Sequence, residues 1–204
     1  SWDQADYLNS ALDHARALSF LGNDGFVGLN SLLDLSPKIP PLASIFNGAV
    51  ISFSGDAPYE AAWSLSFWNG FFIFNIASWG LYLKGKKFSL ICVLISSFSP
   101  FLFYLRTDYV LELPLISAIT FYLFHLGRWS DKARGGKLSQ LVITAFACAL
   151  SLLIKQSSFL IILPSFLFIF IISFKRDKKF KLQFLCLFIF NFLAILPWFY
   201  HNWI

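Results

Sequence analysis

The segment FYLRTDYVLELP, residues 103–114, places three charged side chains between two long apolar stretches, 88–105 and 113–126. No glycine-rich linker carries these charges away from their apolar neighbours. A charged side chain at the centre of a bilayer costs about 2.5–3.5 kcal/mol on insertion scales. The segment therefore predicts a turn at a membrane surface, with its charges directed into a polar cavity. The three residues are Arg106, Asp108 and Glu112.

Composition is typical of a membrane protein. Of the 204 residues, 57% are hydrophobic and only 13% are charged, which is about half the charged fraction of an average soluble domain. Because the sequence contains no methionine and ends directly after an apolar stretch, we expect a fragment or a processed chain. Cys92, Cys148 and Cys186 lie in apolar stretches without metal-ligand spacing, so we expect free thiols buried in lipid and neither a disulfide nor a metal site.

Positive charge is concentrated in short groups between apolar stretches. The net charge is +5, and most of the 16 Lys and Arg residues fall within 84–87, 128–137 and 175–181. An excess of Lys and Arg beside membrane-spanning segments is the pattern of cytoplasmic loops. The charge therefore indicates orientation in a membrane and gives no reason to expect a nucleic-acid partner.

Six apolar stretches predict an all-α, polytopic helical membrane protein. If they cross alternately, the basic groups share one side, which is cytoplasmic, and residues 106–112 and 155–158 lie on the other. We expect two parts, an outer loop at 1–60 and a membrane helix bundle at 61–204. The six predicted crossings are residues 61–83, 88–105, 113–126, 138–154, 159–174 and 182–200.

The outer loop contains two candidate helices that we expect to lie in the membrane interface. A second helix is predicted at 42–53, directly after Pro40 and Pro41, and it is too short to span because spanning needs about 20 residues. The other candidate helix comes earlier in the chain, is amphipathic and ends in a glycine-containing stretch. Its apolar face has helical spacing and consists of Leu8, Ala11, Leu12, Ala15 and Leu18.

Four cations fall on the outer face, which normally lacks them. Arg16 belongs to the polar side of the first helix, and the three beside apolar stretches are Lys38, Arg106 and Lys155. One explanation is structural, since each side chain has an apolar stem that can lie in lipid while its charge reaches the interface. The functional explanation is a shared site for an anion, most simply a phosphate. The sequence leaves both explanations open.

Three acids are candidates for the same face. Glu112 opens a predicted helix, where the helix dipole favours an acid by about 0.3–1 kcal/mol. Asp3 has a structural role available as the cap of a helix that begins at Gln4. The functional alternative for Asp3 is a general base that takes a proton from an acceptor, with Asp6 as the second candidate.

Other ionisable residues have simpler explanations. Asp108 lies two positions after Arg106, so the two side chains can pair. His14 is expected on the polar side of the first helix, and His201 at a membrane interface. Neither histidine is expected to be a metal ligand.

The order of these motifs resembles a family of membrane glycosyltransferases. Along the chain come an acidic motif before a surface helix, Pro-Pro-Leu, a Ser-Pro segment ending in Tyr-Leu-Arg, an acid before Leu-Pro-Leu, an outer Lys-Gln and Leu-Pro-Trp-Phe-Tyr. This arrangement is similar to the GT-C glycosyltransferases of the protein O-mannosyltransferase and lipid A aminoarabinose transferase type. The resemblance covers nearly the whole chain. It implies a fragment of a GT-C fold in a bacterial inner membrane, with residues 1–60 in the periplasm.

The resemblance implies roles for six residues. Asp3 matches the supposed catalytic base, although Gln4 stands where the family commonly has Glu, and Asp6 is positioned to compensate. Glu112 matches the acid, usually Asp, that opens the helix after the Ser-Pro segment. The residues implied in binding the lipid phosphate are Lys38, Lys155 and, as a looser match, Arg106.

The resulting hypothesis is sugar transfer at the non-cytoplasmic face, from a polyprenyl-phosphate donor to an acceptor protein, lipid or glycan. Some family members hold a divalent metal whose ligands would lie partly outside this sequence, so we assign no metal ligand. One alternative is a transporter or lipid flippase with an anion site on its outer face. Another is a non-catalytic membrane subunit whose outer loop docks a partner.

Overall fold

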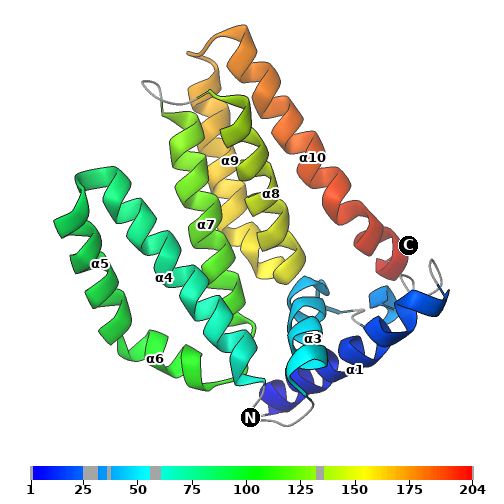
Figure 1. The fold of residues 1–204 in the computed structure, drawn as a ribbon. Coiled ribbons are helices and arrows are strands. Elements are labelled where there is room, and N and C mark those ends of the chain that lie inside the picture. The colour runs from blue at the N-terminus through cyan, green and yellow to red at the C-terminus, as the bar shows by residue number, and fades with distance from the viewer. Residues whose placement is uncertain (1, 25–31, 36–37, 56–60, 132–135, 204) are drawn as a thin grey trace.

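The computed structural model describes residues 2–24, 32–35, 38–55, 61–131 and 136–203, which are all helical or connecting and contain no strand. Two helices, α1 (Trp2–Asp24) and α3 (Leu42–Ser54), lie across one end of a bundle (Figure 1). The all-α prediction is therefore confirmed. The bundle consists of α4 (Ala62–Lys84), α5 (Lys86–Phe98), α6 (Pro100–Thr107), α7 (Glu112–Ser130), α8 (Leu138–Ile154), α9 (Phe159–Ser173) and α10 (Lys178–Trp203).

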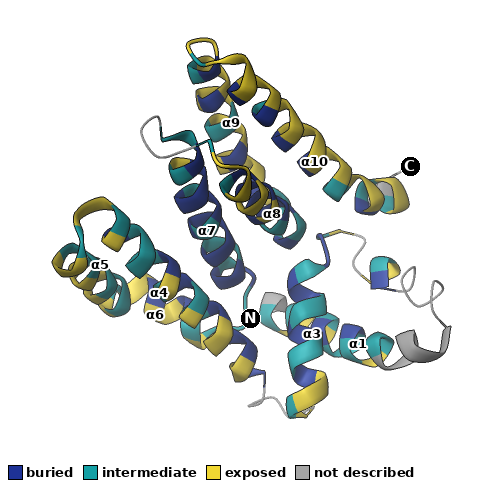
Figure 2. Cartoon of the chain, turned by 45° about the horizontal axis from the view of Figure 1, so that its top comes forward, coloured by how far each residue is buried: buried dark blue, intermediate teal, exposed yellow. Residues whose placement is uncertain are grey.

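The central helix of the bundle is α7. It has buried residues along its length, from Leu113 to Trp129, whereas none of the residues of α5 is buried. Figure 2 shows the same contrast, with α7 largely buried and long exposed faces on α9 and α10. One buried polar side chain joins two helices of the bundle: the Ser117 hydroxyl donates to the carbonyl oxygen of Trp68 at 2.9 Å, which links α7 to α4.

The predicted number of membrane crossings is wrong. Among the described residues, two segments are long and apolar enough to span, Gln156–Ser173 and Lys178–Asn202, and the bent pair α5–α6 is a third if it forms one broken span. The other predicted stretches are helical, but α4 and α7 carry buried serine, asparagine or histidine side chains that lower their hydropathy. With 17 residues, α8 is shorter than the roughly 20 that spanning needs.

The second predicted crossing is broken at Pro100. Helices α5 and α6 meet there at 62°, because proline lacks the N–H that would continue the hydrogen bonding of α5. Directly after the bend, α6 leads to residues 108–111 and then to α7. The bend therefore delivers the charged segment of the sequence to the end of the bundle that α1 and α3 cover (Figure 1).

The apolar face of α1 packs on α3. Its predicted residues Leu8, Ala11, Leu12 and Ala15 cluster with Ile51 of α3 and with Ala61, so α3 covers the face expected to lie on the membrane. The helices approach closely at Gly48. A Cβ atom at this position would lie 2.7 Å from the carbonyl oxygen of Ala11 and 2.8 Å from the amide nitrogen of Ala15.

The two ends of the bundle differ in charge. The turns after α4 and α9 and the end of α7 carry basic residues, and they lie at the end away from α1 and α3 (Figure 1). The opposite end holds α6, the start of α7 and the turn between α8 and α9. The basic groups are thus separated in space from the candidate site residues.

Gly48→Ala should lower the free energy of unfolding by about 1–3 kcal/mol, because the new methyl group meets backbone atoms of α1 that cannot move aside. Gly70→Ala on α4 is the matched control. Nothing lies within 4 Å of a Cβ atom there, so this substitution should raise stability by about 0.4–1 kcal/mol. Denaturant unfolding of the purified variants measures both changes. Equal effects at the two positions would contradict the close packing of α1 on α3.

Candidate functional site

One ion pair joins the start of α7 to the end of α8. Lys155 lies between α8 and the short 3₁₀ helix η1 (Gln156–Ser158), and its ammonium group donates to a carboxylate oxygen of Glu112. Glu112 occupies the first turn of α7, where the helix dipole also favours a carboxylate. The side chains of Lys155 and Glu112 are 24% and 41% exposed, so the pair is partly shielded from water. The structure therefore brings together two predicted site residues that are 43 positions apart.

The backbone of Lys38 contacts the residue that follows Lys155. The side-chain amide of Gln156 donates to the carbonyl oxygen of Lys38 at 2.9 Å. The side chain of Lys38 is exposed, and it forms no ion pair within the described part of the chain. The structure thus places the backbone of Lys38, and not its ammonium group, in contact with the residue that follows Lys155.

An apolar cluster explains why these segments meet. This shared cluster takes its buried side chains from α3, α4, α6, α7 and the end of α8. Leu113 and Ile154 are buried members of it, and Ile39 and Tyr7 pack against it. Full burial of one large apolar side chain stabilises a fold by about 1.5–3 kcal/mol, which exceeds the value of most surface ion pairs. Each of the four apolar residues is adjacent in sequence to one of the candidate residues Asp6, Lys38, Glu112 and Lys155.

The two remaining acids lie on α1. This helix begins at Trp2, so Asp3 is within its first turn and does not precede a helix that begins at Gln4. The side chain of Asp3 is outside the described residues. Asp6 is exposed and forms no ion pair among the residues that the structure describes. Its neighbour Tyr7 reaches the shared cluster, so α1 delivers a carboxylate to this end of the bundle.

Arg106 caps a helix. Its guanidinium group donates to the carbonyl oxygens of Ser97, at 3.0 Å, and Ser96, at 3.3 Å. These carbonyls belong to the last turn of α5 and lack helical partners because the chain bends at Pro100. No ion pair joins Arg106 to Asp108 or Glu112 within the described ranges. Its contacts in the structure are thus those of a residue that holds the α5–α6 bend.

Sequence reasoning missed Tyr109, which lies between α6 and α7 and packs against the shared cluster. Its hydroxyl is buried without a hydrogen-bond partner among the described residues. Burial raises the pKa of the phenol, although Ser64 and Asn47 lie close enough to lower it in part. The phenol is thus held between α6 and α7, close to Ser64 and Asn47.

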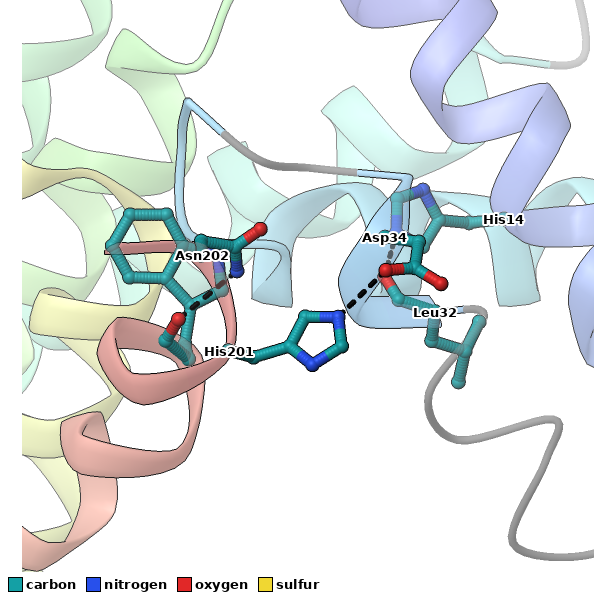
Figure 3. Close-up of polar contacts among 6 residues, drawn as sticks. His14, Leu32, Asp34, His201 and Asn202 are labelled. Carbon is teal, nitrogen blue, oxygen red and sulfur yellow. Dashed lines mark hydrogen bonds and ion pairs between the residues drawn. The ribbon is translucent and has the colours of Figure 1, made fainter. Parts of the chain in front are cut away.

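A polar contact between α10 and the segment after α1 was also not predicted. Nε2 of His201, at the end of α10, lies 2.6 Å from a carboxylate oxygen of Asp34 (Figure 3). The prediction for His14 is wrong: it is fully buried, with its ring nitrogens 2.6 Å from the carbonyl oxygen of Ser10 and 3.2 Å from that of Leu32. The short segment from Leu32 to Asp34 thus connects α1 to α10.

A metal ion has no ligand set in the described part of the site. Among those residues, no three His, Cys, Asp or Glu side chains lie close enough together to hold one. The candidate side chains that meet are one lysine and one acid, Lys155 and Glu112.

Comparison with protein-family models, with curated proteins and with solved structures gave no match. What the structure itself defines is an all-helical protein with two or three candidate membrane-spanning helices. A polar site lies at one end of its bundle, where α7, the α8–α9 turn and Lys38 meet.

The effects of Glu112→Gln and Lys155→Met on the free energy of unfolding should not be additive. Because the pair is partly exposed, a double-mutant cycle should give a coupling of about 0.5–1 kcal/mol that decreases at high salt. The exposed pair Asp13–Arg16 on α1 is the control, with an expected coupling of about 0.2–0.5 kcal/mol. Denaturant unfolding at two salt concentrations measures both cycles, and additive effects at Glu112 and Lys155 would refute their interaction.

Proposed function

We propose that this chain forms the helical membrane part of a GT-C-type glycosyltransferase, which transfers a sugar from a polyprenyl-phosphate donor to an acceptor protein, lipid or glycan. The observation that carries the proposal is the ion pair of Glu112 with Lys155, beside which Gln156 holds the backbone of Lys38, at the end of the bundle opposite the basic turns. If the basic turns are cytoplasmic, the site faces the other side of the membrane. In a bacterium this would be the periplasmic side of the inner membrane.

The depth of Lys155 supports a lipid-linked donor. A candidate membrane-spanning segment begins at Gln156, directly after Lys155, so this cation lies where hydrocarbon would meet the polar surface. A polyprenyl phosphate presents its charge at the same depth. In the proposal Lys38, whose carbonyl contacts Gln156, supplies the second ammonium group, and the ion pair with Glu112 keeps Lys155 in position.

An apolar cavity supports the same donor class. It has a volume of about 320 Å³, lies between α8, α9 and α10, and is lined by Phe, Leu and Ile side chains together with Asn191. This lining suits a hydrocarbon tail. A transporter for a polar substrate would instead be expected to carry ionisable residues near the middle of the membrane. The glycosyltransferase is therefore the better-supported of the two classes.

The proposed reaction is a displacement at the anomeric carbon of the sugar. The acceptor forms a bond to this carbon while the bond from the carbon to the phosphate oxygen breaks, and polyprenyl phosphate leaves. Asp3, or Asp6 as the second candidate, takes the acceptor proton. Lys38 and Lys155 stabilise the charge that develops on the departing phosphate. Arg106 is engaged with α5 and is assigned no phosphate contact.

Incubation of the reconstituted protein with a labelled polyprenyl-phosphate sugar tests the proposal. Asp3→Asn should reduce transfer by about 10²–10⁴-fold, because it removes the proposed base, while membrane insertion and abundance stay unchanged. Wild-type transfer rates in this variant would remove Asp3 from the mechanism. The same substitution at Asp6 distinguishes the two candidate bases.

Lys155→Ala and Lys38→Ala should each weaken use of the donor by roughly tenfold, because each removes a charge-assisted contact to phosphate. Lys86→Ala, on the basic turn at the other end of the bundle, is the matched control and should leave donor use unchanged. The measurement is the dependence of the transfer rate on donor concentration. Unchanged donor affinity and turnover in both site variants would place the anion site elsewhere.

A further inference from the structure

A polar cavity lies at the opposite end of the bundle. It has a volume of about 420 Å³ and is formed by the turn between α9 and α10, the start of α10 and Gly136. Its lining contains three cations and one acid, so it carries a net positive charge. We propose that this cavity binds the headgroup of an anionic phospholipid. Its charged lining residues are Lys175, Arg176, Asp177 and Lys179.

An aromatic stack positions Arg176 in this headgroup cavity. The guanidinium carbon lies 4.6 Å from the centre of the Phe180 ring, and Phe180 stacks on Trp129 with 4.7 Å between ring centres and 11° between planes. Phe180 and Trp129 are 2% and 0% exposed, so the surface under the guanidinium group is fixed by the core. A guanidinium group over a ring face keeps N–H groups for two oxygens of one phosphate.

Gln183 gives the headgroup cavity a rigid wall. Its side-chain oxygen accepts a hydrogen bond from the indole N–H of Trp129 at 3.2 Å, and its side-chain nitrogen donates to the carbonyl oxygen of Gly136 at 3.2 Å. The residue is 8% exposed, so both contacts are shielded from water. They connect α10 to α7 and to the start of α8, which makes the cavity preformed.

The position of the turn favours a lipid over a soluble anion. The turn connects the two candidate membrane-spanning segments, Gln156–Ser173 and Lys178–Asn202, so it lies at the membrane surface when these helices cross. Phe174 and Leu182 beside it are 64% and 62% exposed, which places apolar surface next to the cations. A ligand that matches both features has an anionic headgroup and hydrocarbon chains.

The basic group on the turn between α4 and α5 provides an internal comparison. Lys84, Lys86 and Lys87 also carry three positive charges, and all three are exposed. A general attraction of cations to an anionic membrane surface acts on both basic groups alike. A formed headgroup site instead requires Arg176 specifically, with its planar guanidinium group and its aromatic support.

Native mass spectrometry of the purified protein tests the proposal, with dioctanoyl phosphatidylglycerol, dioctanoyl phosphatidylcholine and inorganic phosphate as probes. Wild-type protein should retain phosphatidylglycerol at lower concentration than the other two. Arg176→Gln should weaken this binding roughly tenfold, as expected for loss of charge-assisted hydrogen bonds. Arg176→Lys keeps the positive charge but lacks the planar guanidinium group, so its affinity for phosphatidylglycerol should lie between those of wild type and Arg176→Gln. Lys87→Gln, with the same change in net charge, should bind as wild type does.

Three results would overturn the proposal: equal binding of the two lipids, equal losses in Arg176→Gln and Lys87→Gln, or inorganic phosphate bound as tightly as phosphatidylglycerol. The last result would assign the cavity to a soluble anion. An unfolding midpoint for each variant separates loss of the site from loss of the fold. Lys179→Gln changes an exposed residue of the same lining and repeats the test if Arg176→Gln does not fold. The outcome does not depend on whether the protein transfers sugars.

Discussion

The packing of α7 against the end of α8 is the constraint on which the rest of the site depends. Leu113 and Ile154 are buried in the shared apolar cluster, and the residues next to them in sequence, Glu112 and Lys155, form an ion pair at its edge. Apolar burial supplies most of the stabilisation, because a partly exposed ion pair contributes only up to about 1 kcal/mol. The pair in turn neutralises two charges beside a candidate membrane-spanning segment, where an isolated charge is unfavourable.

Local sequence patterns predicted the helices well, because helical spacing, glycine and proline act within a few residues. The spacing of Leu8, Ala11, Leu12 and Ala15 identified the apolar face of α1, and the prolines before residue 42 identified the start of α3. The number of crossings was wrong because an apolar stretch can be buried by other helices as well as by lipid. Inside the bundle, Ser117 of α7 finds a hydrogen-bond partner on α4 that lipid would not provide.

The candidate site was predictable to the extent that it follows from the order of segments along the chain. Alternation of helices places Lys38, Glu112 and Lys155 at one end, and the structure has them there. The cap that Arg106 forms depends on the angle at Pro100, and the pair of Asp34 with His201 depends on where a loop returns. Neither contact can be predicted from the spacing of residues in the sequence, since both depend on how distant segments pack.

Carbodiimide coupling followed by mass spectrometry tests the central geometry most directly, because the reagent joins a carboxylate to an amine only where the two are in contact. In the membrane-embedded protein we predict an amide link between Glu112 and Lys155, which is lost in Glu112→Gln. A link from Glu112 to Lys137 or Lys179, at the opposite end of the bundle, would contradict this account. So would the absence of any Glu112–Lys155 link under conditions that couple other acid–lysine pairs of the same protein.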